Sequence, residues 1–92
     1  MMEEGTSFVQ SVRIYTTTYC GYCRMAKDLL GKRGIPFEEI DVTDDDGKRE
    51  WLVETTGRQT VPQIFIGEEA IGGFTDLAAL DKSGSLEKKL ER

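Results

Sequence analysis

The order in which apolar spacing changes along this 92-residue chain restricts its fold more than any single motif does. Alternation of apolar and polar residues predicts a β-strand, and recurrence at every third or fourth position predicts an amphipathic helix. Residues 8–16 (FVQSVRIYT) alternate, with Val12 and Ile14 on one face, and predict a first strand. The helical spacing follows at Tyr22, Met25, Ala26, Leu29 and Leu30. Gly34, with Pro36 two residues later, predicts the end of that helix.

The rest of the chain continues this succession of strands and helices. In chain order we expect a strand at 37–42, a helix capped by Thr43 or Asp44 and ending near Gly57, a hairpin of 61–66 and 70–71, a helix at 75–81 and a helix from Ser85. The order βαβαββαα predicts an α/β fold in which helices pack on a small central sheet. The length predicts one domain spanning residues 1–92.

Charge and composition exclude several classes of function. The net charge of -5 argues against a nucleic-acid surface, which needs basic patches. The first residues, MMEEGTS, are acidic where a secretory signal would be basic, and no apolar stretch follows that could insert into a bilayer. We therefore expect a cytoplasmic protein that acts on neither nucleic acid nor membrane.

Both cysteines of the chain, Cys20 and Cys23, lie two residues apart at the start of the first predicted helix. Such a pair is half of a metal site, a structural disulfide, a reactive pair, or two small buried apolar residues. Zinc needs four ligands, and this chain has no histidine and no further cysteine, so we expect no zinc site. A disulfide here closes too short a loop to restrict the unfolded chain much. The pattern therefore favours a reactive pair.

The position of the pair predicts a division of labour. If the helix begins at Gly21, Cys20 is its N-cap, and the backbone N–H groups of Tyr22 and Cys23 point towards the Cys20 sulfur. Those groups and the helix dipole favour a thiolate, so Cys20 is predicted to be the nucleophile. The basic residues Arg24 and Lys27 add positive charge nearby. Cys23 is placed to attack a mixed disulfide formed on Cys20.

Three motifs, CGYC at 20–23, TVPQIFI at 60–66 and IGGFTDL at 71–77, occur in this order, and with them the chain resembles glutaredoxins from about Val12 to Leu90. The resemblance implies a thioredoxin-like fold with a four-stranded mixed sheet and flanking helices. It also implies glutathione-dependent reduction of protein disulfides and of glutathione mixed disulfides. Glutathione is then the reductant, and the partners are disulfide-bearing or glutathionylated proteins met by a monomer.

The same resemblance implies a glutathione-binding set. It comprises Tyr22, Arg58, Thr60, Val61, Pro62, Gly73, Thr75 and Asp76. In the family the bond before the proline at position 62 is cis, which frees the backbone of Val61 to pair with glutathione like an added strand. The Gly73 region holds the γ-glutamyl carboxylate, and Asp76 faces its amino group. Tyr22 and Arg58 line the cysteinyl and glycyl ends, although Tyr22 also fits the apolar face of the helix.

Two departures from the family pattern keep other functions open. Thr17 stands where many glutaredoxins carry a lysine that contacts the glycyl carboxylate of glutathione. Arg58 is then expected to make more of that contact. The missing lysine also keeps open a second function, a thioredoxin-like electron donor served by a flavoprotein reductase. Gly21 stands where the commonest motif has proline. Some relatives without that proline hold a [2Fe–2S] cluster between two subunits, each giving its first cysteine, here Cys20, and a bound glutathione.

Overall fold

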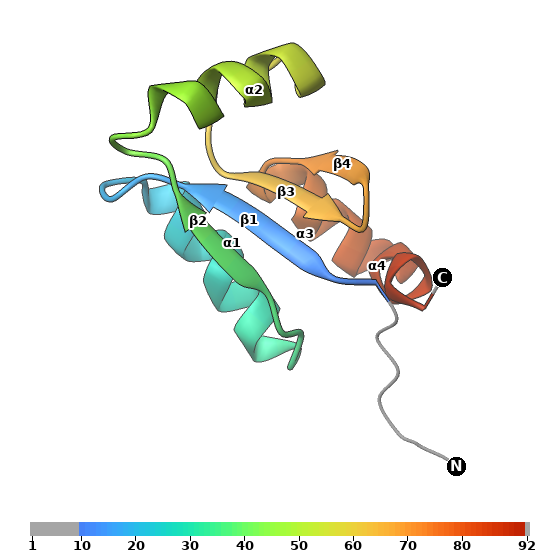
Figure 1. Ribbon diagram of the computed structural model, residues 1–92. Helices are drawn as coiled ribbons and strands as arrows, with labels where there is room; N and C mark the ends of the chain where they lie inside the picture. The colour runs from blue at the N-terminus through green and yellow to red at the C-terminus, as the bar shows by residue number, and fades with distance from the viewer. Residues whose placement is uncertain (1–9, 92) are drawn as a thin grey trace.

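The computed structural model describes residues 10–91, and in it strands and helices follow one another in the predicted order (Figure 1). In chain order these are β1 (Val12–Thr16), α1 (Gly21–Lys32), β2 (Glu38–Asp41), α2 (Asp46–Thr56), β3 (Gln63–Ile66), β4 (Glu69–Gly72), α3 (Phe74–Ser83) and α4 (Ser85–Leu90). Within this part of the chain, no helix combines the length and the apolar character that crossing a bilayer requires.

The four strands form one mixed sheet in the order β2-β1-β3-β4. Strand β1 pairs with β2 in parallel and with β3 antiparallel, and β3 pairs antiparallel with β4. A parallel pair cannot be joined by a tight turn, so α1 serves as the crossover between β1 and β2. This is the thioredoxin-like mixed sheet that the resemblance implied.

Helices cover both faces of the sheet, with α1, α3 and α4 on one and α2 on the other (Figure 1). Successive residues of a strand point to opposite faces, so Ile14 enters the larger core and Tyr15 the smaller one. The larger core contains Val12, Ile14, Ala26, Leu30, Ile35, Ile64, Ile66, Leu77, Leu86 and Leu90. The smaller one, under α2, contains Tyr15, Val42, Leu52 and Phe65.

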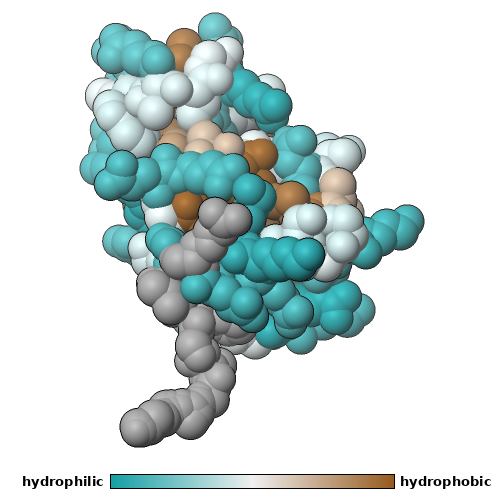
Figure 2. All heavy atoms as spheres, turned by 90° about the vertical axis from the view of Figure 1, so that its right-hand side faces the viewer, coloured by the Kyte–Doolittle hydropathy of each residue, from teal (hydrophilic) through white to brown (hydrophobic). Residues whose placement is uncertain are grey.

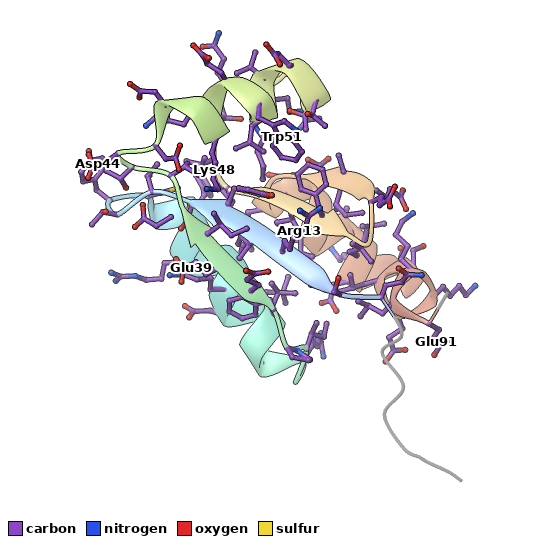
Figure 3. All side chains as sticks on the ribbon, viewed as in Figure 1. Arg13, Glu39, Asp44, Lys48, Trp51 and Glu91 are labelled. Atoms are coloured by element: carbon purple, nitrogen blue, oxygen red, sulfur yellow. The ribbon has the colours of Figure 1, made fainter. Side chains whose placement is uncertain are left out.

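The smaller core ends in a partly open rim of aromatic and charged groups. The Trp51 ring lies 5.8 Å from the ring centres of both Tyr15 and Phe65. Arg13 lies over the same two rings, with its guanidinium carbon 5.1 Å from the centre of Phe65 (Figure 3). On the side of the molecule that Figure 2 shows, hydrophilic side chains predominate.

Several predicted boundaries are wrong by a few residues. The first strand begins at Val12, and the predicted positions 8 and 9 lie outside the described residues. The third strand begins at Gln63 and not at residue 61, and α3 runs from Phe74 to Ser83. The strands are shorter than predicted because hydrophobic spacing continues past the point at which backbone pairing stops.

The N-cap of α2 is Asp45, and the predicted caps Thr43 and Asp44 are wrong. The carboxylate of Asp45 accepts the backbone N–H of Lys48 at 3.0 Å. Thr43 instead accepts the backbone N–H of Thr18 at 2.9 Å. Three neighbouring residues could each cap a helix here, and the tertiary contact with Thr18 engages the Thr43 hydroxyl elsewhere.

The buried face of α1 is rotated from the predicted one. Cys23, Ala26 and Leu30 are buried, whereas Tyr22 and Met25 are 61% and 45% exposed. The alternative that Tyr22 packs in the core is therefore wrong. The apolar positions of α1 span a wider arc than the sheet can cover, so packing leaves one edge of that arc exposed.

Candidate active site

Cys20 lies where β1 has ended and α1 begins, and it is the N-cap of α1, as predicted. Its sulfur accepts the backbone N–H of Cys23 at 3.1 Å. The same thiol donates to the carbonyl oxygen of Val61 at 3.5 Å. The sulfur therefore lies between the N-terminus of α1 and the loop before β3. It thus faces the positive end of the α1 helix dipole.

Cys23 has a different environment, with 1% of its surface exposed. Burial, and after it the hydrogen bond with Cys20, raises the pKa of the Cys23 thiol to about 12. Both cysteines are free thiols. The alternative of two buried apolar residues fits Cys23 by its burial but not Cys20, which is only partly buried. The pair thus combines one accessible sulfur with one covered sulfur.

Lys27, one of the basic residues predicted to add positive charge near the pair, forms an ion pair with Glu39 of β2. The distance from Lys27 Nζ to Glu39 Oε2 is 2.9 Å, and this hydrogen bond holds the pKa of Glu39 below its usual range. Thr16 donates to the same carboxylate oxygen at 2.8 Å. Lys27 therefore anchors α1 to the sheet edge (Glu39, Figure 3).

A small polar network holds the loop that precedes Cys20. Besides its backbone bond to Thr43, Thr18 brings its hydroxyl oxygen to 2.9 Å from that of Thr43. Thr43 in turn donates its backbone N–H to Asp41 at 2.8 Å. These hydrogen bonds from Thr43 hold the pKa of Asp41 below its usual range. Nothing in the sequence signals this network, because Thr18 and Thr43 are 25 residues apart and each is an ordinary loop residue.

The loop before β3 forms one wall of the site. The Val61–Pro62 bond is cis, as the resemblance implied. The buried side chain of Gln63 donates to the carbonyl oxygen of Arg58 at 2.9 Å and ties the two ends of the loop together. The loop is thus fixed beside Cys20, whose thiol reaches Val61.

One groove of about 420 Å³ collects the predicted glutathione-binding residues. All eight of them line it, together with Phe74: Tyr22, Arg58, Thr60, Val61, Pro62, Gly73, Phe74, Thr75 and Asp76. They come from α1, from the loop before β3 and from the start of α3. The volume lies in the range that small-molecule sites occupy.

The α3 end of the groove is charged and already ordered. Asp76 accepts the backbone N–H of Gly73 at 3.0 Å and pairs with Arg58 at 3.2 Å. The Gly73 N–H and then Arg58 hold the pKa of Asp76 below its usual range, so the carboxylate is ionised at neutral pH. Gly72 has φ +118°, and a Cβ there would collide with the Asp76 carboxylate. Glycine is therefore required where the backbone passes this charge.

Phe74 is the groove residue that sequence reasoning missed. Its ring stacks on Tyr22, with ring centres 6.3 Å apart and an interplanar angle of 28°. Its other contacts are with the larger core. An aromatic residue at the first position of a helix was the available signal, but only the packing of α3 against α1 shows what the ring touches.

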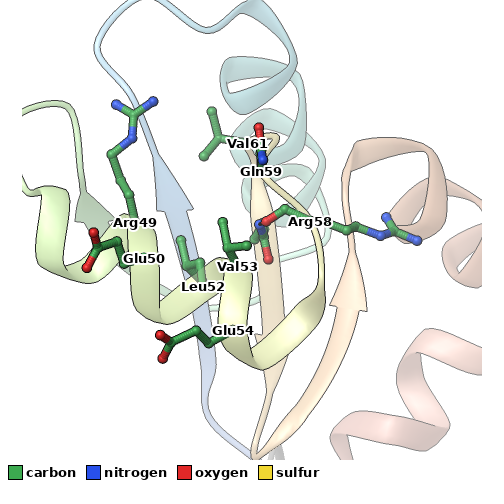
Figure 4. Close-up of a pocket in the computed structure, with 9 residues that line it drawn as sticks. Arg49, Glu50, Leu52, Val53, Glu54, Arg58, Gln59 and Val61 are labelled. Atoms are coloured by element: carbon green, nitrogen blue, oxygen red, sulfur yellow. Dashed lines mark hydrogen bonds between the residues drawn. The ribbon is translucent and has the colours of Figure 1, made fainter.

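A second, larger pocket of about 520 Å³ lies between α2 and the loop before β3 (Figure 4). It shares Arg58 and Val61 with the groove, although the Arg58 side chain extends away from it towards α3 (Figure 4). Its lining contains no cysteine. Within residues 10–91, no cluster of three or more Cys, His, Asp or Glu side chains could hold a metal ion.

Comparison with known proteins places this site in a known family. The glutaredoxin family model matches residues 12–71. The chain is 46% identical over 81 residues to glutaredoxin 3 of Escherichia coli (strain K12), covering 88% of this chain and 98% of that protein. It is 46% identical over 79 residues to a glutaredoxin of Pseudomonas aeruginosa, covering 86% and 94%.

Solved structures agree with the sequence relatives. The solution structure of glutaredoxin from Brucella melitensis has a TM-score of 0.82 at 42% identity, covering 95% of each chain. The crystal structure of a buckwheat glutaredoxin–glutathione complex has a TM-score of 0.83 at 30% identity, covering 90% of this chain and 78% of that one.

Proposed function

The chain belongs to the glutaredoxin family and is a glutathione-dependent thiol–disulfide oxidoreductase, and on that premise we propose that Cys20 attacks the substrate and Cys23 resolves the product. The observation that carries this assignment is the asymmetry of the pair. The Cys20 sulfur accepts an N–H at a helix N-terminus and is partly exposed, whereas Cys23 is buried. A thiolate at such a position is a better nucleophile than a covered thiol.

In the first step the Cys20 thiolate attacks one sulfur of the substrate disulfide. A new S–S bond forms to Cys20, the old one breaks, and the other substrate sulfur leaves as a thiolate. When the substrate is a protein–glutathione mixed disulfide, Cys20 takes the glutathionyl group and the protein thiol is released. A second glutathione thiolate then attacks this adduct, giving glutathione disulfide and restoring Cys20.

In the reduction of a protein disulfide the substrate stays tethered to Cys20, and Cys23 attacks the mixed disulfide. The backbone N–H of Cys23 lies 3.1 Å from the Cys20 sulfur, so the Cys23 thiol is close to the mixed disulfide that it has to attack. The products are the Cys20–Cys23 disulfide and a substrate dithiol. Two glutathione molecules then reduce the pair and leave as one molecule of glutathione disulfide.

For glutathione we propose a pose along the groove. Its γ-glutamyl carboxylate meets the backbone N–H groups between Gly73 and Thr75, and its amino group faces Asp76. Its backbone pairs with Val61, beside Thr60 and Pro62. Arg58 pairs with Asp76 here, so it has to leave that carboxylate to reach the glycyl end. This pose is supported by the fact that all eight residues line one groove.

Two variants test the roles of the cysteines. Cys20→Ser is expected to abolish reduction of both glutathione mixed disulfides and protein disulfides, because no other accessible thiol is available among residues 10–91. Cys23→Ser is expected to keep deglutathionylation, to lose most dithiol reduction and to accumulate the Cys20–glutathione adduct. Both assays, with mass spectrometry of the adduct, measure this. Equal loss of both activities in Cys23→Ser would contradict the resolving role.

The partners we propose are disulfide-bearing or glutathionylated proteins in a reducing cytoplasm, met by a monomer. The electron source is tested by comparing turnover with glutathione and its reductase against turnover with a thioredoxin reductase. A [2Fe–2S] cluster would need Cys20 from two copies and two outside thiols, because the other cysteine of the chain is buried. The visible absorption of freshly purified protein, prepared under low oxygen, tests for it.

A further inference from the structure

Exposed apolar side chains gather around the nucleophile. Among the described residues the large apolar side chains with the most exposure are Tyr19 at 84%, Tyr22 at 61%, Met25 at 45% and Trp51 at 41%. Trp51 packs on two rings of the smaller core, on the other face of the sheet. The remaining three flank Cys20 in the chain, and we call them the Tyr19–Met25 strip.

The three residues of the strip lie close to Cys20 along the chain. Tyr19 is bonded to Cys20, and Tyr22 and Met25 lie three residues apart on α1, which makes them neighbours on the helix surface. The ring of Tyr22 is held in place by its stacking on Phe74. Tyr22 also lines the groove, whereas Tyr19 and Met25 do not. The strip therefore begins at the groove and extends away from it.

We propose that the Tyr19–Met25 strip is the docking surface for apolar side chains that flank the reactive cysteine of a protein disulfide substrate. The proposal rests on the proposed role of Cys20 as the attacking thiol. Exposed apolar patches at a functional site commonly mark contact with a partner. Tyrosine offers a rigid amphipathic contact, and methionine adapts to partners of different shape.

The chemistry of the reaction decides what covers the strip. In the mixed disulfide the Cα atoms of the two joined cysteines are roughly 4–7 Å apart. The substrate residues on either side of its cysteine are each about 3.8 Å further along their chain. Tyr19 is at the same spacing from Cys20, and Met25 lies about 7.5 Å along the axis of α1 from Cys20. A tethered substrate therefore places its flanking side chains within reach of the strip.

The test compares two peptides that differ only at these flanking positions. Both carry one intramolecular disulfide and have equal length and charge. One has leucine or phenylalanine next to its cysteines, and the other has serine or glycine. A third substrate, hydroxyethyl disulfide with glutathione, reports the reaction without a protein partner. The enzymes are the wild type, the double variant Tyr19→Ser/Met25→Ser, and Lys32→Ser as a control at an exposed position at the far end of α1.

The double variant is expected to lower kcat/KM roughly 10-fold for the apolar-flanked peptide, as loss of partial burial of two apolar side chains predicts. Turnover of the polar-flanked peptide and of hydroxyethyl disulfide is expected to stay within about twofold of wild type, and Lys32→Ser to match wild type throughout. For each peptide, the kcat/KM of the variant is divided by that of the wild type, so the intrinsic reactivity of the peptide cancels. If Met25→Ser disturbs folding, Tyr19→Ser alone carries the test, because Tyr19 precedes the helix.

Equal losses for the two peptides, or no loss for the apolar-flanked one, would overturn the proposal. A wild-type dimer in sedimentation that the double variant cannot form would also overturn it, because the strip would then bind a second copy. Failure of the proposed function is distinguishable: it shows as hydroxyethyl disulfide turnover that survives Cys20→Ser, whatever the peptides do.

Discussion

At the scale of single residues, Cys20 and Cys23 are one helical turn apart and yet are chemically unlike. The sulfur of Cys20 belongs to a partly exposed residue and receives a backbone N–H, whereas Cys23 is buried. Burial disfavours the charged form of a thiol. Reactivity towards an outside reagent should therefore be confined to Cys20.

Alkylation of the reduced protein with iodoacetamide at neutral pH is expected to modify Cys20 and to leave Cys23 unmodified. The reason is the burial of Cys23, which also raises its pKa to about 12. Peptide mapping by mass spectrometry locates the label, and protein unfolded in guanidinium, where both thiols react, is the control. Labelling of Cys23 as fast as Cys20 in the folded protein would show that the site opens readily.

The Cys23 thiol should also make stability depend on alkaline pH. Its pKa is about 12 when folded, against an ordinary value of 9.0. Below pH 9 the thiol keeps its proton in both states, so its full contribution to stability is present. Between pH 9 and 12 the unfolded chain loses the proton while the folded protein keeps it, so stability falls as pH rises.

Urea midpoints of wild type and Cys23→Ala, measured from pH 7 to pH 11, test this linkage. The wild-type midpoint is expected to fall more steeply above pH 9 than that of the variant, which lacks the thiol. Lysines and tyrosines titrate in both proteins and cancel in the comparison. Parallel curves would mean that Cys23 is no harder to ionise in the folded state than in the unfolded one.

At the scale of elements, α1 has ends of opposite character. Its N-terminus is capped by the sulfur of Cys20, and at its C-terminus backbone N–H groups of the following residues donate to its last carbonyl oxygens. Gly34 at φ +69° donates to Gly31, and Ile35 donates to Leu30 at 2.9 Å. As the sequence indicated, Gly34 marks the end of the helix, directly after the C-cap Arg33. Changes at this end should alter stability without altering the reaction.

Gly31 and Gly34 form a matched pair of alanine substitutions. Apart from the adjoining residues and the backbone of the helix itself, no atom lies within 4 Å of a Cβ added at either glycine. Gly31→Ala lies inside the helix and is expected to stabilise by about 0.5–1 kcal/mol. Gly34→Ala is expected to destabilise by about 1 kcal/mol, because its backbone is left-handed. Urea unfolding measures both, and a change of the same sign in both would contradict this account.

At the scale of the whole molecule, the buried Leu90 and the candidate active site lie near opposite ends of β1. Cys20 follows the carboxyl end of that strand. Near its amino end, the backbone N–H of Gln10 donates to the carbonyl oxygen of Leu90 in α4, and the Leu90 side chain is fully buried in the larger core. Helix α4 is short and depends on this burial for its position.

Leu90→Ala is therefore expected to lower the free energy of unfolding by roughly 2–5 kcal/mol. Its turnover of hydroxyethyl disulfide at 25 °C is expected to match wild type, because the site is at the other end of the sheet. Lys88→Ala, at an exposed position of the same helix, is the control and is expected to change neither quantity much. A proportional loss of activity in Leu90→Ala would show that the two ends are coupled.

The sequence by itself determined the succession of strands and helices and the place of the reactive pair. Both depend on neighbours in the chain: hydrophobic period selects strand or helix, and a cysteine just before a helical pattern becomes its N-cap. The three motifs then indicated the family and eight residues of the groove. The predicted element boundaries were wrong where several adjacent residues were equally suitable, as at the N-cap of α2, which is Asp45.

Only the tertiary structure decided what depends on contacts between distant segments. The rotation of α1 about its axis, which buries Cys23 and exposes Tyr22, is set by packing on the sheet, and the periodicity allowed either residue to face inwards. The stacking of Phe74 on Tyr22 and the pairing of Arg58 with Asp76 join residues 52 and 18 positions apart. Hydrophobic spacing describes one element at a time, so it carries no information about which side chains meet when elements pack.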